Sequence, residues 1–128
     1  MKATIEITAA NFKELVEKDG IVFLDWWASW CGPCRAFGPV YEKVAATHPD
    51  IAFGKVDTEA EQQLAAAFDI RSIPTLMILR DNVLVFSQAG ALPEAALDDL
   101  VGQVRALDMA EVRAQLAAQD AKAAKPTG

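Results

Sequence analysis

The 128-residue sequence predicts an α/β domain in which one mixed β-sheet is covered by helices on both faces. Three observations lead to this prediction. Short runs rich in β-branched residues alternate with stretches of helical periodicity. One run, Ile21–Trp27, is almost entirely apolar, which is typical of a central strand buried on both faces. The last two runs, Leu76–Leu79 and Val83–Phe86, are so close in sequence that they predict an antiparallel hairpin.

The composition limits the partners and locations that suit the chain. Hydrophobic residues make up 52% of it, which is enough for one buried core, but no apolar run approaches the roughly 20 residues of a membrane span. The net charge is −6, with 12 basic residues scattered among 18 acidic ones. Nucleic acids and anionic membranes are therefore disfavoured, because both need clustered Lys and Arg. The first six residues lack the apolar segment of a secretory signal, so we expect a cytoplasmic protein, and we expect a monomer.

The first half of the chain alternates between strands and helices. Ala3–Ile7 is rich in β-branched residues and predicts a short strand. Thr8 is placed to cap a helix that Gly20 ends, and a second helix begins around Cys31–Pro33 with a kink at Pro39. The expected inward residues of the first helix are Phe12, Leu15 and Val16, and those of the second are Phe37, Val40, Tyr41, Val44 and Ala45.

The second half adds a strand, two helices and the hairpin, which makes five strands and four helices. Ile51–Val56 predicts the third strand. Thr58 and Glu61 form a capping-box pattern that opens a helix, and Pro93 stands where helix starts favour proline. The expected inward residues of these two helices are Leu64, Ala65 and Phe68, followed by Leu97, Leu100, Val101, Val104 and Leu107.

Residues 108–128 form a C-terminal extension beyond a domain of residues 1–107. Asp108 and Glu111 repeat the capping-box pattern, and a narrow apolar stripe indicates a short helix: Met109, Val112 and Leu116. Lys122–Gly128 has no apolar residue except alanine, so we expect it to fray. The extension could pack on the sheet edge, bind a partner, or merely fray.

The motif Cys31-Gly32-Pro33-Cys34 carries the chemistry. At a helix start the two cysteines lie one turn apart on nearly the same side, within the Cα separation that a disulfide tolerates. Unpaired backbone N–H groups and the positive end of the helix dipole favour thiolate at Cys31, and the thiolate is the nucleophile in disulfide exchange. Cys34 should be shielded and protonated inside the first turn, whose shape Pro33 restricts.

Two other interpretations of the cysteine pair stay open. With two Cys and one His the chain cannot build a self-contained tetrahedral zinc site, so a metal or iron–sulfur cluster would have to be shared between two chains. Alternatively, the chain is a binding module whose thiols are incidental. The position of the motif, between a buried strand and a proline-bearing helix start, favours a redox function.

Three separated motifs resemble the thioredoxin family. Trp27–Cys34 is similar to its active-site signature, and Arg71–Thr75 and Gly90-Ala91 resemble two further landmarks in the same order and spacing. The resemblance covers about residues 1–107. It implies the thioredoxin fold, a five-stranded mixed sheet flanked by four helices, to which this chain adds its short helical extension. It also implies reduction of disulfides in target proteins, no bound cofactor, and recycling by an NADPH-dependent thioredoxin reductase.

Asp25 is a charged residue inside Ile21–Trp27, the strand expected to be buried. A buried carboxylate is costly unless it protonates or finds partners; the alternative is a strand-end Asp that reaches solvent. The resemblance implies that Asp25 lies beneath Cys34 and exchanges a proton with it, so we expect Asp25 to be a general base with a raised pKa. Lys55 matches the family's neighbour of this Asp, and its alternative is a solvated strand lysine.

The resemblance also implies the surface that receives a target protein. About 5–6% of X–Pro bonds in folded proteins are cis, yet the family implies a cis Ile73–Pro74 bond, with Pro74 against the cysteine pair and the Ile73 backbone free to pair with a substrate chain. An exposed apolar patch around a thiolate suits extended protein segments. The residues expected to form or adjoin this patch are Trp30, Gly32, Pro33, Ile73, Pro74, Thr75, Gly90 and Ala91.

Four more residues complete the sequence-based expectations. Trp27 should be structural, packed under the active-site loop, and Trp26 stands where many family members have Phe. Ser72 replaces a common Gly, which changes the groove beside the proline. His48 lies near the end of the second helix, where a cation is favourable, and we expect no catalytic role for it.

Overall fold

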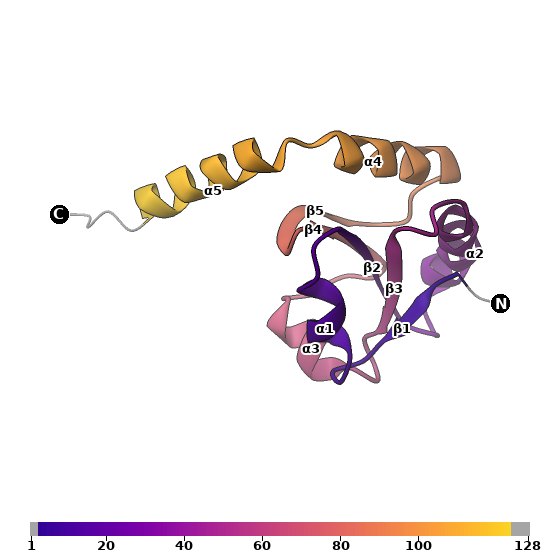
Figure 1. Ribbon diagram of the computed structural model, residues 1–128. Helices are drawn as coiled ribbons and strands as arrows, with labels where there is room; N and C mark the ends of the chain where they lie inside the picture. Colours follow the sequence, from indigo (N-terminus) through magenta and orange to yellow (C-terminus); the bar gives the residue numbers. More distant parts are fainter. Residues whose placement is uncertain (1–2, 124–128) are drawn as a thin grey trace.

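The computed structural model describes residues 3–123 and contains one five-stranded sheet in the order β1-β3-β2-β4-β5 (Figure 1). The strands are β1 (Ile5–Ile7), β2 (Ile21–Trp27), β3 (Ala52–Asp57), β4 (Thr75–Arg80) and β5 (Val83–Ala89). The helices are α1 (Phe12–Val16), α2 (Gly32–Thr47), α3 (Gln62–Ala67), α4 (Glu94–Ala106) and α5 (Met109–Ala123). Strands β1, β3 and β2 are parallel, whereas β4 pairs antiparallel with both β2 and β5. The predicted mixed sheet is confirmed.

The central strand β2 sends its side chains alternately to two cores. Phe23 belongs to a core shared with α2 and α4, while Leu24 and Trp26 belong to a core shared with α1 and α3. Figure 1 shows these two pairs of helices on opposite faces of the sheet. Asp25 follows the alternation of Phe23, so its carboxylate points toward the face that α2 covers.

Helix α2 begins where the sequence predicts and continues through Pro39 to Thr47. Four of its five expected inward residues are buried and Val40 is partly buried. His48 caps its end, and His48 Nε2 lies 2.8 Å from Asp98 Oδ1 on α4. In α4, Leu97, Val101 and Val104 are buried as expected.

The predicted helix caps at Thr8 and Thr58 are wrong because these residues make a turn and a tertiary contact instead. Helix α1 begins at Phe12 rather than after Thr8, since the Asn11 side chain accepts a hydrogen bond from the Thr8 N–H at 2.7 Å and forms a turn there. It ends at Val16, before Gly20. Helix α3 has no side-chain cap. The Thr58 hydroxyl donates instead to the Trp27 carbonyl at 3.1 Å.

The hairpin between β4 and β5 is confirmed, and both strands are longer than expected. Asp81 and Asn82 form its turn with φ of 52° and 65°, the left-handed conformation of a two-residue type I′ turn. At the same end of the sheet, Asp81 Oδ1 accepts a hydrogen bond from the Gly20 N–H at 2.8 Å. The turn is thereby tied to the start of β2.

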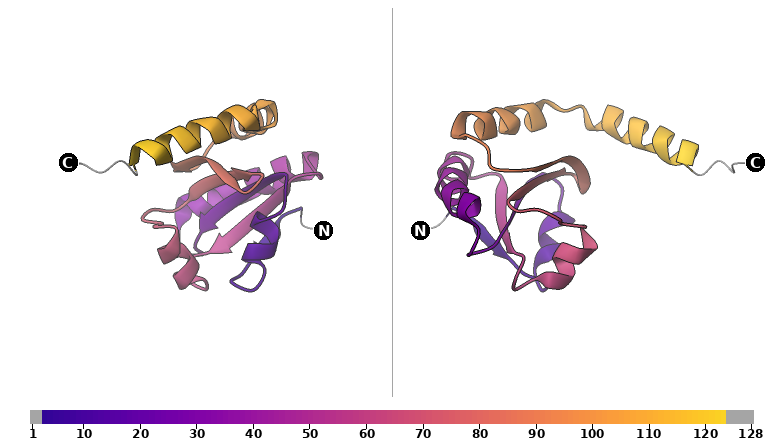
Figure 2. Two further views of the ribbon diagram at one scale, coloured as in Figure 1. Left: turned by 60° about the vertical axis from the view of Figure 1, so that its left-hand side comes forward. Right: turned by 180° about the vertical axis from the view of Figure 1, so that it is seen from behind.

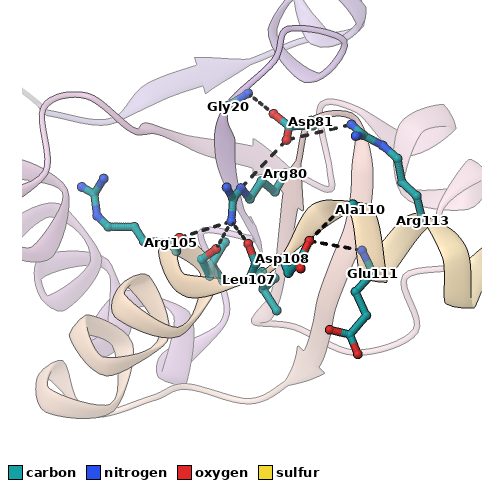
Figure 3. Close-up of polar contacts among 10 residues, drawn as sticks. Gly20, Arg80, Asp81, Arg105, Leu107, Asp108, Ala110, Glu111 and Arg113 are labelled. Atoms are coloured by element: carbon teal, nitrogen blue, oxygen red, sulfur yellow. Dashed lines mark hydrogen bonds and ion pairs between the residues drawn. The ribbon is translucent and has the colours of Figure 1, made fainter.

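The C-terminal extension forms α5, which continues beyond the end of α4 (Figures 1 and 2). Val112 and Leu116 of α5 line a surface pocket together with Leu84 of the edge strand β5. Asp108 Oδ1 accepts hydrogen bonds from the N–H groups of Ala110 and Glu111, so the Asp108 half of the predicted capping box is confirmed (Figure 3). Met109 is buried, but Leu116 is 38% exposed. Helix α5 reaches Ala123 and so includes the first two residues of the segment expected to fray; residues 124–128 of that segment lie outside those described. Within residues 3–123, no helix is both long and apolar enough to cross a membrane.

Arg80 fixes the end of α4 to the sheet (Figure 3). Its Nη1 donates to the carbonyls of Val104, Leu107 and Arg105 at 2.8, 2.7 and 3.3 Å. Carbonyls in the last turn of a helix have no intrahelical donor, and a cation there also complements the helix dipole. Arg80 therefore satisfies the end of α4 at the point where the chain turns into α5.

The Arg80→Met substitution should lower the free energy of unfolding by about 2 kcal/mol, because it keeps the apolar stem and removes charged hydrogen bonds to carbonyls at the end of α4. Urea unfolding measures this loss. The matched control is Arg71→Met, since the Arg71 side chain is 83% exposed and its replacement should change stability by less than about 0.5 kcal/mol. Equal effects of the two substitutions would contradict the role assigned to Arg80.

Gly54→Ala should destabilise the protein by about 1–3 kcal/mol through overpacking. A Cβ at Gly54 would lie 2.6 Å from Ile7 Cγ1 and 3.3 Å from Leu24 Cδ2. In a double-mutant cycle, Ile7→Ala should make Gly54→Ala less costly, since it removes the atoms that clash. Gly102→Ala on α4 is the control, because its Cβ would meet nothing within 4 Å and alanine favours a helix. If the losses in unfolding free energy from Ile7→Ala and Gly54→Ala simply add in the double mutant, a clash between the new Cβ and Ile7 is excluded.

Candidate functional site

Cys31 and Cys34 are joined by a disulfide at the start of α2. Cys31 is the N-cap residue with an extended backbone, and Gly32 and Pro33 open the helix. The two Cα atoms lie 5.2 Å apart, within the range that disulfides favour. Cys34 is buried as expected, and in this oxidised state Cys31 is buried as well, with 3% and 5% exposure respectively. One helical turn thus holds both sulfurs together.

The N-terminus of α2 points a backbone donor at the first sulfur. The Cys34 N–H donates to Cys31 Sγ at 3.2 Å, so Cys31 receives one of the N–H groups that a helix start leaves unpaired. When the disulfide is reduced, this donor and the helix dipole stabilise negative charge on Cys31 Sγ. The arrangement favours one nucleophilic thiolate in the pair.

The loop before β4 lies against the cysteine pair. Its Ile73–Pro74 bond is cis, as the family resemblance implied, and the Ile73 carbonyl oxygen lies 3.7 Å from Cys31 Sγ. The Gly90 N–H donates to the Pro74 carbonyl at 2.8 Å. The Thr75 side chain is buried, and its hydroxyl donates to the Ser72 carbonyl at 2.6 Å. These bonds fix the backbone of the loop next to Cys31.

An exposed apolar surface surrounds the pair. Trp30 is 66% exposed, Ile73 is half-buried, and Pro74 is buried beneath the surface rather than part of it. The other expected members, which are all exposed, are Gly32, Pro33, Gly90 and Ala91. Most of the expected patch is therefore present beside Cys31.

Glu59 is a site residue that the sequence reasoning missed. Its Oε1 accepts a hydrogen bond from Trp30 Nε1 at 2.6 Å, which restrains the exposed indole. Trp30 follows β2 and Glu59 follows β3, and these strands are parallel neighbours. Loops at the carboxyl ends of adjacent parallel strands meet at one sheet edge, so the strand order was the signal that could have found Glu59.

Asp25 is fully buried in β2, which excludes the alternative of a strand-end carboxylate in solvent. Neither of its carboxylate oxygens has a hydrogen-bond partner among the described residues. Burial raises the pKa of the Asp25 carboxyl from 3.8 to about 7, and the Lys55 ammonium opposes part of that rise. A carboxyl with this pKa can accept and release a proton near neutral pH.

Lys55 pairs with Asp25 in the β2–β3 register. Its Nζ lies 4.7 Å from the centroid of the Trp27 ring, a cation–π distance. It is therefore held over Trp27 rather than fully solvated. Trp27 is half-buried, and its carbonyl accepts hydrogen bonds from the Thr58 N–H and hydroxyl. This placement agrees with a structural position for Trp27 under the loop.

A surface pocket of about 340 Å³ reaches Cys34 and Lys55 from the outside. Its walls are Thr4, Trp27, Cys34, Arg35, Gly38, Pro39, Glu42 and Lys55. Among residues 3–123, no group of three or more His, Cys, Asp or Glu side chains is arranged to hold a metal ion. The chemistry that these residues can perform themselves is dithiol–disulfide exchange with a buried proton acceptor.

Comparisons with known proteins agree with this geometry. The thioredoxin family model matches residues 3–103. A Streptomyces coelicolor protein assigned as a thioredoxin 2 is 59% identical over 123 residues, which cover 96% of this chain and 92% of the relative. Thioredoxin C-3 of Corynebacterium nephridii is 39% identical over 77% of this chain and 69% of its own length.

A solved structure shows the same fold. A mutant thioredoxin from Halobacterium salinarum superposes with a TM-score of 0.75 at 30% sequence identity, covering 82% of this chain and 93% of the other. The Cys31–Cys34 disulfide occupies the position of the family's redox-active pair. The fold, the motif and the sequence matches agree, and the chain belongs to the thioredoxin family.

Proposed function

We propose that this protein is a protein-disulfide reductase that acts on disulfides of target proteins. The observation that carries the proposal is the Cys31–Cys34 disulfide itself, formed at a helix N-terminus beside an exposed apolar surface. Proteins of this family exchange dithiols and disulfides. An open surface suits a protein segment better than a small polar substrate, which needs an enclosed pocket.

In the first proposed step, the Cys31 thiolate attacks a sulfur of the target disulfide. A bond forms between Cys31 Sγ and that sulfur, the target disulfide breaks, and the other target sulfur leaves as a thiolate that solvent protonates. Trp30, Ile73, Gly90 and Ala91 contact the target segment, and Pro74 shapes the loop. The Ile73 backbone aligns the segment with Cys31.

In the second proposed step, Cys34 resolves the mixed disulfide. Asp25 accepts the Cys34 proton, and the new thiolate attacks Cys31 Sγ. The bond from Cys31 to the target breaks, and the target sulfur leaves with the electron pair. Lys55 moderates the proton affinity of Asp25, because its ammonium favours the ionised carboxylate. The target ends reduced, and Cys31 and Cys34 end as a disulfide.

The cycle then needs an electron donor. By family analogy this is an NADPH-dependent thioredoxin reductase, which gives the protein a place in electron transport and cell redox homeostasis. We place the protein in the cytoplasm, where thiols are kept reduced, as a monomer with no bound cofactor. Residues 1–107 form the redox domain, and residues 108–128 form its C-terminal extension.

Cys34→Ser should trap target proteins as mixed disulfides through Cys31, because the first step proceeds and the second cannot. Cys31→Ser should trap none and serves as the matched control. Non-reducing gel electrophoresis after exposure to disulfide-bonded proteins reveals the adducts, which a thiol reductant removes. Equal retention of partners by both variants would favour a binding module instead.

Asp25→Asn should slow the decay of the mixed disulfide by about 10²-fold at pH 8, within the range for loss of a positioned base. In the wild type this rate should rise with pH around a midpoint near 7, the pKa of Asp25, because only the ionised carboxylate accepts the proton. Stopped-flow measurements across pH test both points. An unchanged pH profile in the variant rejects Asp25 as the base.

The stability of the same variant checks the pKa independently. The folded-state pKa of Asp25 lies above the unfolded value, so the wild type loses stability as the pH rises from about 4 through 7. Relative to wild type, Asp25→Asn should therefore be more stable at pH 8 than at pH 4, by on the order of 4 kcal/mol. A difference independent of pH would contradict the raised pKa.

A further inference from the structure

Gly38 on helix α2 lies close to the Lys55 side chain on β3. Gly38 lies four residues after Cys34, so both face the sheet from one side of the helix. A Cβ on Gly38 would lie 3.6 Å from Lys55 Nζ and would contact no other described atom outside its own helix within 4 Å. A methyl group would fit at this distance, whereas a longer side chain would take the space that the ammonium occupies.

The space left at Gly38 belongs to the pocket that reaches Cys34. At about 340 Å³, the pocket far exceeds the roughly 10–15 Å³ that one water molecule needs. Two residues of its wall are joined by a hydrogen bond, in which the Thr4 hydroxyl before β1 donates to Glu42 Oε2 on α2 at 2.7 Å. The pocket is therefore large enough to hold water molecules next to Cys34 and Lys55.

Neither oxygen of the Asp25 carboxyl has a hydrogen-bond partner among the described residues. Its strand neighbour on β4 is the apolar Leu76. Its charged neighbour on β3 is Lys55, which forms part of the pocket wall. Lys55 therefore links the surroundings of Asp25 to the pocket wall that Gly38 shares.

Building on the proposed reductase function, we propose that Gly38 is a positioning residue for the resolving step. It keeps open the pocket through which the Cys34 proton reaches solvent, and it leaves room for the Lys55 ammonium beside Asp25. The proton passes from Cys34 to the Asp25 carboxylate and from there to water, while the Cys34 thiolate displaces the target sulfur from Cys31.

Besides Asp25 on β2, the charged and titratable groups around the pocket and the buried carboxyl come from two elements. Helix α2 contributes Cys34, Arg35, Tyr41 and Glu42, and β3 contributes Lys55. The buried Tyr41 hydroxyl donates to the Gly54 carbonyl at 2.8 Å, so its proton is already engaged. Lys55 is the cation whose placement a larger residue at position 38 would alter.

The test is a series of Gly38→Ala, Gly38→Val and Gly38→Leu, in which stopped flow follows formation and decay of a mixed disulfide with a disulfide-bonded peptide. Formation should stay within about twofold of wild type, since Cys31 does not line the pocket. Decay should slow with side-chain size, by about tenfold for Leu, a fraction of the 10²–10⁴ that a positioned proton transfer contributes. The pH midpoint of decay should rise above 7, because displacing the ammonium and adding apolar contact both favour the neutral acid.

Gly102→Leu on α4 is the matched control. A Cβ there would meet nothing within 4 Å, so it adds the same helix propensity without touching the pocket and should leave decay and midpoint unchanged. The decisive comparison uses the largest residue at position 38 that keeps the wild-type circular dichroism and formation rate; Gly38→Ala should move both quantities least. An unchanged decay rate and midpoint in that variant overturns the proposal. Failure of Cys34→Ser to trap targets would instead refute the reductase function.

Discussion

The burial of one unpartnered carboxylate is the constraint on which the rest of this structure depends. Asp25 sits in the central strand with no exposure, where an ionised group is costly unless it protonates or meets a counter-charge. The fold supplies a partial counter-charge in Lys55 and stacks the start of α2 above the same sheet face. An apolar residue would be more stable at this position. The cost of burial instead raises the pKa of the Asp25 carboxyl to about 7, which is the property that the proposed proton transfer from Cys34 uses.

The parallel arrangement of β1, β3 and β2 gathers the rest of the site at one edge of the sheet. The chain leaves β2 into Trp30 and Cys31, and leaves β3 into Glu59, so residues from separate loops meet without a dedicated binding domain. The antiparallel β4 approaches the same edge from the other direction and brings the Ile73–Pro74 bond to Cys31. Main-chain bonds fix these loops, so the thiol chemistry can proceed without rearrangement of the fold.

The strands, α2 and the cysteine pair could be predicted from the sequence because local pattern and tertiary environment agree there. The burial of Asp25 and the cis bond at Pro74 needed the family resemblance as well, since the pattern alone left the first undecided and favoured trans for the second. The predicted caps are wrong because the Thr8 backbone N–H forms a turn with Asn11 and the Thr58 hydroxyl donates to the Trp27 carbonyl. Glu59 and Gly38 depend on which loops and helices lie opposite each other, which no local pattern contains.

The extension is attached at the end of the sheet that lies away from the cysteines. Pro74 and Gly90 meet near Cys31 at one end of β4 and β5, whereas Arg80 holds the α4–α5 junction at the other. Strands of this length separate their ends by about 20 Å, so changes in α5 need not disturb the thiols. The family model stops at residue 103, yet the Streptomyces coelicolor match leaves only five of the 128 residues outside it. The match to that relative therefore takes in most of the sequence of α5, and Arg80 ties this helix to a domain whose cysteine pair lies at the other end of the sheet.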